Sequence, residues 1–517
     1  MSAKYDYVSE RQLAVLDIAQ VFRLIREMKR EAKISLVELI GELTMIRKKK
    51  RSGLSLFDLF SMGFGAMVGV GWSATLNNLY KNGGGPIPAT IGFSLATIVF
   101  IPIALCFAEL APAVPVSGGV IAYAKKAFGK KMTFIAGWFV AMAYISIVPW
   151  ESIAINDIVS YIFPVLKSGS PIYTLAGENI YLPTIILGIV MSGIVFTINW
   201  HGVEKGATFQ TIMTLGLLVG SLICVVFALM KANISNLITP VYSQISGKNH
   251  TTMIAGIFTM FGLAPSYFAG FDTIPQSVEA APNVKKKAMG KVIVIALFSA
   301  GLFYAMIFLS AGLAYPWTST IGMNRPVLSN MLQTIYPGVE GKILWYICIV
   351  ATLAGLFSTW NGFYIAGSRV LYGMAKAGVI PELFAREHPK YKTPYIASLF
   401  VAVTMVIGPF LGAGILDILS ILSSAGFVIG WGIACAAVIK LRKTEPTLSR
   451  PYKIPGGNVL PLIAAVCCVA MFFNCVIPGM PGYMGTGGLI AFAVWSALGC
   501  VFYYFNNHTV KFPLPKK

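Results

Sequence analysis

Two short stretches place helix-breaking residues inside apolar runs long enough to cross a bilayer. The stretch SYFAGFDTIPQ at 266–276 contains Gly270, Asp272 and Pro275, and the stretch SMGFGAMVGVGW at 61–72 contains four glycines. In hydrocarbon, a broken helix leaves N–H and C=O groups unpaired at a high cost, unless a ligand, an ion or neighbouring protein satisfies them. Both stretches therefore predict a binding site built from backbone groups.

Apolar runs recur along almost the whole chain. Of its 517 residues, 56% are hydrophobic and 12% charged, with a mean hydropathy of +0.74. A soluble core could not bury that much apolar surface. We therefore predict an all-α integral membrane protein with twelve transmembrane helices. The expected spans are 57–80, 86–108, 132–163, 181–199, 206–230, 252–278, 291–315, 342–372, 394–413, 416–439, 457–478 and 486–506.

The interrupted spans are the first and the sixth. Glycine and proline at corresponding places in two halves point to an inverted repeat of five plus five helices, with substrate bound between the unwound centres. Glycine is also common in membrane helices because it allows close packing, so one glycine-rich span would not decide the question. Two such spans at this spacing favour a binding site near the midplane.

The charge distribution predicts the orientation. The net charge is +20, and lysines and arginines are spread over alternate connecting loops. This pattern fits the positive-inside rule, and it makes nucleic-acid binding the poorer explanation. We expect a multi-pass protein of the inner or plasma membrane with both termini cytoplasmic. The first fifty residues are polar and charged, so no cleavable signal peptide is expected.

Four parts of the chain are expected. In the cytoplasmic segment 1–56, apolar residues from Val15 to Ile25 recur at helical spacing and predict an amphipathic helix. The run RKKKR at 47–51 fits attraction to anionic inner-leaflet lipids. This segment either orients the first span or has a regulatory or docking role. The other parts are a ten-helix transport core at 57–441, a loop with the last two helices at 442–506, and a basic tail at 507–517.

Metal and covalent chemistry are not indicated. All eight cysteines lie in or beside apolar spans, and the four histidines never pair at helical spacing. We therefore predict no metal site and no cofactor. An enzyme would need paired acids, an activated nucleophile or metal ligands at membrane depth. No such set is visible, so an enzyme is not expected.

Glu151, in SIVPWESIAIND, lies near the middle of the third span. An unpaired carboxylate is costly at that depth, so it should face a cavity or a partner. Three roles are open: a hydrogen-bonded structural acid, a group that exchanges a proton during transport, and a partner for a substrate ammonium group.

Five motifs occur in an order typical of one family. They are GAMVGVGW in the first span, FAELAPAVPVSGGVIAYAKKAFG at 107–129, YFAGFDTIPQSVEAAPNVKKKAMGKVI at 267–293, STWNGFYIAGSRVLYGMAKAGVIPELFAREHPKYKTP at 358–394 and RPYKIPGG at 450–457. Together they resemble the amino acid–polyamine–organocation (APC) superfamily of permeases. The resemblance implies a LeuT-like fold and secondary active transport of an amino acid or related amine. A nutrient sensor that binds amino acids without transporting them is the alternative.

The resemblance assigns the substrate to the two breaks. The half-helix after Gly71 would offer free N–H groups to a carboxylate, and carbonyls around Ala269 and Gly270 would accept from an ammonium group. Val70 replaces a serine of many relatives, and Ser266 replaces their usual gating aromatic. The expected substrate-binding residues are Gly69, Val70, Gly71, Trp72, Ser266, Tyr267, Phe268, Ala269 and Gly270, with the three aromatic residues covering the substrate.

The resemblance also bears on ion coupling. Sodium-coupled relatives carry a hydroxyl pair on the eighth span, where Ser358 aligns and Thr359 is a substitute partner. Some proton-coupled relatives carry a lysine in the fifth span, but TIMTLGLLVGSL contains none. Exchange, facilitated uptake and proton coupling through Glu151 stay open, and sodium is less favoured. Asp272 and Pro275 are expected to hold the kink in the sixth span.

Overall fold

The computed structural model of the protein describes residues 53–508 apart from 117, 238–252, 322, 324, 325 and 481. The predicted amphipathic helix, the run at 47–51 and the tail beyond 508 lie outside the described residues. The described residues from Leu54 onward form one compact unit.

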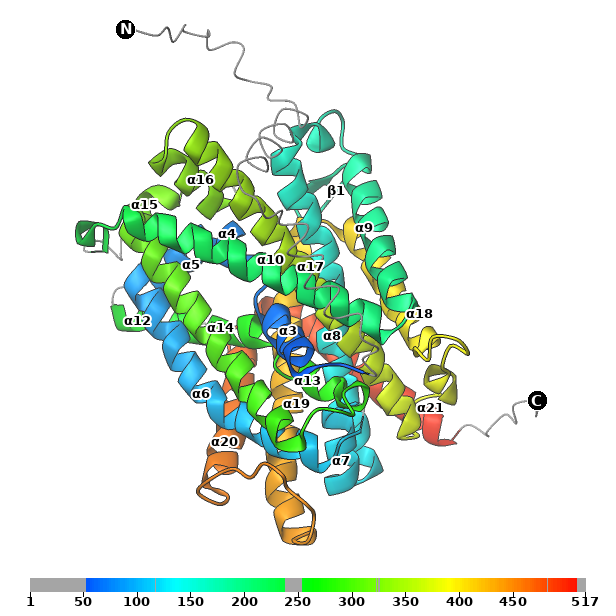
Figure 1. Cartoon of the computed structure of the whole chain (residues 1–517). Helices are drawn as coiled ribbons and strands as arrows, with labels where there is room; N and C mark the ends of the chain where they lie inside the picture. Colours follow the sequence, from blue (N-terminus) through cyan, green and yellow to red (C-terminus); the bar gives the residue numbers. More distant parts are fainter. Residues whose placement is uncertain are drawn as a thin grey trace, which may run out of the picture. The chain divides into compact units, whose positions relative to one another are not determined.

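The first half of the described chain is helical except for one hairpin (Figure 1). The hairpin pairs β1 (Tyr173–Leu175) with β2 (Glu178–Ile180) in antiparallel register, and it follows the 3-10 turn η1 (Pro164–Lys167). The helices are α3 (Leu56–Met67), α4 (Gly71–Ala74), α5 (Leu76–Gly83), α6 (Pro86–Ala113), α7 (Val120–Phe128), α8 (Lys130–Ile162), α9 (Leu182–Trp200) and α10 (Val203–Met230).

The second half repeats the pattern of long helices joined by short ones. The α-helices are α12 (Met253–Phe268), α13 (Thr273–Gln276), α14 (Lys286–Ala314), α15 (Trp317–Thr320), α16 (Val327–Ile335), α17 (Val339–Lys376), α18 (Tyr395–Leu411), α19 (Leu416–Thr444), α20 (Val459–Val476) and α21 (Gly485–His508). The 3-10 turns are η2 (Ile234–Leu237), η3 (Val278–Ala280), η4 (Glu382–Ala385) and η5 (Ala413–Ile415).

The helices are long and apolar enough to confirm a multi-pass membrane protein. Among the described residues, 11 helices meet the length and hydropathy that a bilayer requires. A further apolar helix, α18, has 17 residues and falls just short of that length. The count of twelve spans and the inverted repeat stay predictions.

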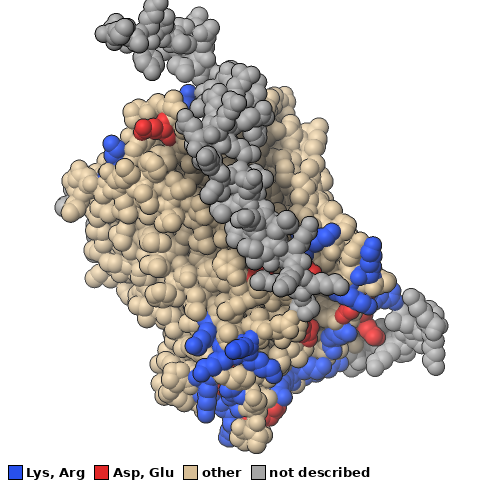
Figure 2. Space-filling model, in the orientation of Figure 1, with Lys and Arg blue, Asp and Glu red and all other residues tan. Residues whose placement is uncertain are grey.

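Two groups of helices pack among themselves. One group contains α3, α6, α12 and α14, in which α14 lies along α6. The other contains α8, α9, α17 and α18, in which α17 and α18 lie against α8. In the view of Figure 2, lysine and arginine side chains gather toward one end, over α7 and the loop that follows α19. That gathering agrees with the predicted charge asymmetry, while the orientation of the termini stays a prediction.

Local sequence explains where the first span begins. Ser55 and Asp58 form a capping box, in which the Ser55 hydroxyl accepts from the Asp58 N–H at 3.2 Å and Asp58 accepts from the Ser55 N–H at 2.9 Å. Asp58 also accepts from the Thr211 hydroxyl of α10 at 2.8 Å. The start of α3 is therefore fixed both locally and against a neighbouring span.

Candidate functional site

The first span is broken where its glycines predict. Helix α3 ends at Met67, and α4 begins at Gly71. No described residue accepts a hydrogen bond from the N–H groups of the four residues Gly69, Val70, Gly71 and Trp72. Because α4 has only 4 residues, its dipole is small, and these unpaired donors are the feature that an anion would recognise.

The sixth span is broken between Phe268 and Thr273. Gly270 has a φ of +141°, a conformation that residues with a Cβ rarely adopt. Its carbonyl accepts from the Thr273 N–H at 2.9 Å and from the Thr273 hydroxyl at 2.7 Å. The carbonyls of Phe268 and Ala269 accept no hydrogen bond from the described residues. Acceptors are therefore open beside Gly270, and Gly270 itself serves the backbone turn.

The two breaks touch each other. A Cβ placed on Gly71 would lie 2.7 Å from Cε1 of Tyr267, and a Cβ placed on Gly270 would lie 2.7 Å from the backbone nitrogen of Met67. At Gly270 the Cβ would meet backbone, so the close approach requires glycine, whereas at Gly71 it would meet the edge of a ring that would have to shift. The two interrupted segments that carry the predicted donors and acceptors therefore lie against each other.

The three predicted covering aromatics have different surroundings. Tyr267 is half-buried and lies against Gly71, while its ring contacts Tyr304 at 5.8 Å between centroids. Trp72 is fully buried and packs edge-on against Phe303 of α14. Phe268 is fully buried among aromatic rings of α6 and α14. Only Tyr267 therefore lies against the glycine that follows the first break.

Two residues beside the breaks bond to helix backbone. The Ser266 hydroxyl donates to the Leu263 carbonyl at 2.9 Å, within its own helix. The Tyr304 hydroxyl of α14 donates to the Met67 carbonyl at 3.0 Å and so satisfies an acceptor at the end of α3. Tyr304 was not predicted as a site residue, because the sequence does not show which backbone group a tyrosine in an apolar span will bind.

Glu151 lies on α8 and is 2% exposed. Its Oε2 atom has no hydrogen-bond partner among the described residues, and no described lysine, arginine or histidine forms an ion pair with it. A buried acid without a partner fits a group whose partner or proton changes during the working cycle.

Asp272 holds the second break to α8. Its carboxylate accepts from the Gly270 N–H at 3.1 Å and from the Tyr144 hydroxyl of α8 at 2.9 Å. Asp272 is fully buried, and so is Pro275 on the short helix α13. This geometry fits the structural role expected of Asp272 in the kink.

The hydroxyl pair on α17 is already hydrogen-bonded. Ser358 Oγ lies 2.9 Å from the amide nitrogen of Gln210 and 3.0 Å from Thr214 Oγ1, both on α10. Thr359 donates to the Gly65 carbonyl at 3.1 Å. Gln210 was not among the predicted site residues, although a glutamine inside an apolar span is a signal that could have singled it out.

Gln210 is the centre of a network that joins four spans. Its amide nitrogen also donates to the Ser61 carbonyl of α3 at 3.1 Å, and its amide oxygen accepts from Asn361 of α17 at 2.7 Å. The Asn361 amide oxygen accepts in turn from Asn199 of α9 at 2.7 Å. All three amide side chains are buried, so the network is well shielded from water.

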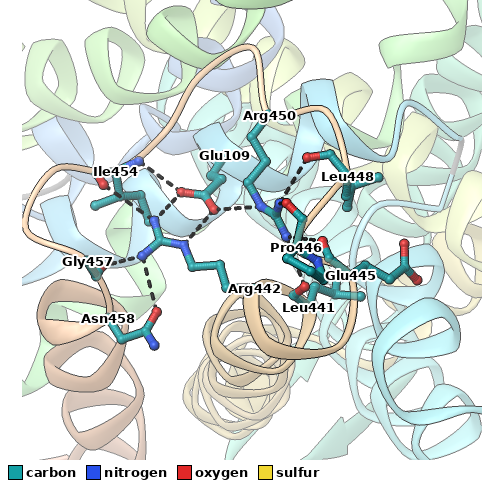
Figure 3. Close-up of polar contacts among 10 residues, drawn as sticks. All are labelled: Glu109, Leu441, Arg442, Glu445, Pro446, Leu448, Arg450, Ile454, Gly457 and Asn458. Atoms are coloured by element: carbon teal, nitrogen blue, oxygen red, sulfur yellow. Dashed lines mark hydrogen bonds and ion pairs between the residues drawn. The ribbon is translucent and has the colours of Figure 1, made fainter.

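A second buried cluster explains two of the family-like motifs (Figure 3). Glu109, from FAELAP at the end of α6, is 1% exposed and pairs with Arg442 of α19 at 2.5 Å and Arg450 of RPYKIPGG at 3.3 Å. It also accepts from the Ile454 N–H at 2.9 Å. Arg442 bonds in turn to the Gly457 carbonyl. The cluster therefore fixes the loop between α19 and α20 to the end of α6.

Comparison with known proteins identifies the family of the chain. A model of the amino acid permease family matches residues 54–503. The chain is 27% identical to a branched-chain amino acid permease of Bacillus subtilis, over 91% of this chain and 96% of the relative. It is 24% identical to a methylthioribose transporter (87% and 92%) and 26% identical to a serine/threonine exchanger (80% and 89%) of the same bacterium. The predicted resemblance is confirmed, and the chain belongs to the amino acid permease family.

Proposed function

We propose that the protein is a secondary transporter that binds an amino acid at the two helix breaks and moves it across the membrane by alternating access. The observation that carries this proposal is the contact between the two broken segments, one of which has unpaired N–H groups and the other open carbonyls. A zwitterion needs one donor-rich and one acceptor-rich site at close range.

The two groups of helices support the proposed motion. The first group carries both breaks, and the second carries Glu151 and the α17 hydroxyls. The main contact between the two groups is that of α3 with α17. We expect the first group to rock against the second around the substrate. The plasma membrane, with both termini cytoplasmic, is the proposed location, and the family supports a transporter over a sensor or an enzyme.

We propose that transport does not use sodium. A sodium ion between α3 and α17 would need oxygen ligands such as the Ser61 carbonyl and Ser358 Oγ. Both oxygens already face the amide nitrogen of Gln210, at 3.1 and 2.9 Å. The Gln210 amide N–H groups therefore already satisfy the two oxygens that a sodium ion would have to bind. Glu151 is the proposed proton-exchanging group.

The substrate class follows from the backbone, and the side-chain pocket sets the selectivity. The half-buried Tyr267 is the residue placed to contact a substrate beside Gly71. The relatives named as a branched-chain amino acid permease, a serine/threonine exchanger and a methylthioribose transporter differ in substrate, so the family alone does not select one. An α-amino acid is the proposed substrate, because it presents both charges that the breaks would recognise.

Reconstituted protein tests the proposal. Purified protein in liposomes should accumulate or exchange a labelled amino acid, and a panel of unlabelled amino acids and amines should identify the substrate by competition. A sensor would bind the labelled compound without moving it across the membrane. Protein that neither binds nor moves any amino acid, while remaining folded, would refute the function.

A further inference from the structure

A groove lies on the surface at adjoining ends of α9 and α10, far in sequence from the helix breaks. Its volume is about 590 Å³. The lining residues come from α9, from α10 and from the short turn between them. They are Thr197, Ile198, His201, Glu204, Lys205, Thr208, Phe209 and Ile212. The proposed transport mechanism gives this groove no role.

The walls of the groove are apolar. Thr197 donates its hydroxyl to the Gly193 carbonyl at 2.7 Å, and Thr208 donates to the Glu204 carbonyl at 2.8 Å, so neither hydroxyl needs an outside acceptor. Phe209 is half-buried, and Ile212 is 44% exposed. From Val203 at the start of α10 to Ile212, the helix advances about 14 Å, which reaches from headgroup depth into the hydrocarbon.

The two helices face lipid. Only 33% of the residues in the most apolar window of α9 and 39% in that of α10 are buried, against 72% for α8. Exposed aliphatic side chains continue along both helices beyond the groove, among them Ile194, Leu215 and Val219. Hydrocarbon chains are therefore expected to border the groove.

The mouth of the groove is basic. Lys205 is exposed at the mouth, and Glu204 is the one acidic residue in the lining. The loop at 388–392 adds Lys390 and Lys392, both exposed. Tyr391 of that loop contacts the His201 ring at 5.3 Å between centroids, and Lys390 lies 5.3 Å from the Tyr391 ring. Lys205 therefore lines the mouth, and two further exposed lysines belong to the loop that contacts His201 through Tyr391.

Aromatic side chains fix the loop to the helix ends. The Trp200 and His388 rings lie 5.3 Å apart between centroids, and His388 packs against Tyr391 at 4.8 Å. His201 is held by a hydrogen bond between its Nδ1 atom and the Thr197 carbonyl at 2.7 Å. Aromatic residues of this kind gather where a membrane helix meets the headgroups. The groove therefore crosses from the interface into the bilayer.

From this arrangement we infer that the α9–α10 groove is a binding site for one anionic phospholipid. The negatively charged headgroup sits at Lys205 and Lys390, and an acyl chain lies along Ile198, Phe209 and Ile212. A zwitterionic lipid can occupy the same groove, but the lysines attract its headgroup less strongly because that headgroup has no net charge. The lipid comes from the leaflet that borders the basic end of the helices, which is the cytoplasmic leaflet under the positive-inside rule.

Native mass spectrometry of the full-length protein, titrated with dioleoyl phosphatidylglycerol or dioleoyl phosphatidylcholine, tests the site. Wild-type protein should bind one phosphatidylglycerol on the order of tenfold more tightly than phosphatidylcholine, and Lys205→Gln with Lys390→Gln should remove that preference. Lys440→Gln with Lys443→Gln changes two exposed lysines of α19 and should keep it. Thr208→Trp fills the groove and should reduce retention of both lipids.

Equal binding of the two lipids by the wild type would overturn it, and so would equal loss of preference in the α19 control, which would indicate general surface attraction. Unchanged binding after Thr208→Trp, in protein with an unchanged melting temperature, would show that the acyl chain lies elsewhere.

Discussion

The Tyr144 hydroxyl on α8 donates to the Asp272 carboxylate at 2.9 Å and so links one helix group to the second break. A second link lies nearby, where the Arg369 guanidinium on α17 donates to the Gln276 carbonyl at 3.2 Å. The amide side chain of Gln276 is fully buried, and neither of its polar atoms has a partner among the described residues. Separation of the two groups here would break two links and expose that amide to water.

Tyr144→Phe should therefore favour opening at this end. The change removes one hydrogen bond to a buried carboxylate, which costs about 1–3 kcal/mol in the closed arrangement. A cysteine introduced at the buried Ser277 should react several-fold faster with a charged maleimide in this background than in the wild type.

The matched control is Tyr364→Phe. Its hydroxyl donates to the Ser398 carbonyl at 3.0 Å, and both residues belong to the second helix group. This variant loses a similar bond without loosening the contact between groups, so the labelling rate should stay at the wild-type value. Equal rates in all three proteins would show that Tyr144 does not hold the closed state.

The two break glycines should respond differently to alanine. At Gly71 the new Cβ meets the edge of the Tyr267 ring, which can shift, whereas at Gly270 it meets backbone in a conformation with φ of +141°. Gly71→Ala should weaken amino acid binding about tenfold with little change in melting temperature. Gly270→Ala should lower the melting temperature as well, because the strain adds about 1–3 kcal/mol.

Binding by scintillation proximity and melting in detergent measure the two effects separately. Gly216→Ala on α10 is the control, since its Cβ would meet only Ala354 Cβ at an ordinary 3.5 Å. Wild-type affinity in Gly71→Ala would remove the first break from the substrate site.

Loss of the Glu109 carboxylate should lower the free energy of unfolding more than loss of an exposed ion pair does. Glu109→Gln leaves Arg442 and Arg450 buried without their shared carboxylate, and breaking such a pair costs about 3–5 kcal/mol. Lys126→Gln breaks the exposed pair with Glu445 and should cost about 0–1 kcal/mol. Thermal melting of the two variants compares these costs directly, and equal melting temperatures would contradict the structural role of the cluster.

The sequence predicted both helix breaks because their cause is local. Gly71 and Gly270 lie within a few residues of the interruptions that they permit, so the signal is contained in short stretches. The membrane class was predictable for a similar reason, since a span is a continuous apolar run. Neither inference requires knowledge of which helices are neighbours.

Contacts between distant spans could not be predicted in this way. Gln210 and Ser358 are 148 residues apart, and Glu109 and Arg442 are 333 apart, so only the fold shows that they meet. The rotation of each helix was also unknown. Trp72 and Phe268 lie beside the breaks in sequence, yet their rings pack among other aromatic side chains in the interior.

Sodium should have no effect on uptake. The Gln210 amide nitrogen already meets the oxygens that a sodium ion would need, so replacing sodium with choline at constant osmolarity should leave the rate unchanged. Gln210→Leu should be destabilised by about 1–3 kcal/mol, because the Ser61 carbonyl, Ser358 and Asn361 each lose a hydrogen-bond partner. Sodium-dependent uptake by the wild type would refute the proposed role of the glutamine.

Glu151→Gln tests the proposed proton exchange, because glutamine keeps the shape of the side chain and cannot titrate. The carboxyl group is buried, and its Oε2 atom has no partner among the described residues. If a proton moves with the substrate, net uptake by the variant should lose its dependence on pH, while exchange of substrate across the membrane continues. Uptake and exchange in liposomes, measured between pH values on both sides of neutrality, separate the two activities.

A second role for Glu151 has a different signature in the same variant. If the carboxylate pairs with the substrate ammonium group, binding of basic amino acids or amines should weaken by about 1–3 kcal/mol, and neutral substrates should be spared. Glu279→Gln is a control at an exposed acid on η3, and it should alter neither property. An unchanged pH profile together with unchanged affinities would leave Glu151 as a structural acid, and the proton would then have to move through Asp272, which Tyr144→Phe and Asp272→Asn would test in turn.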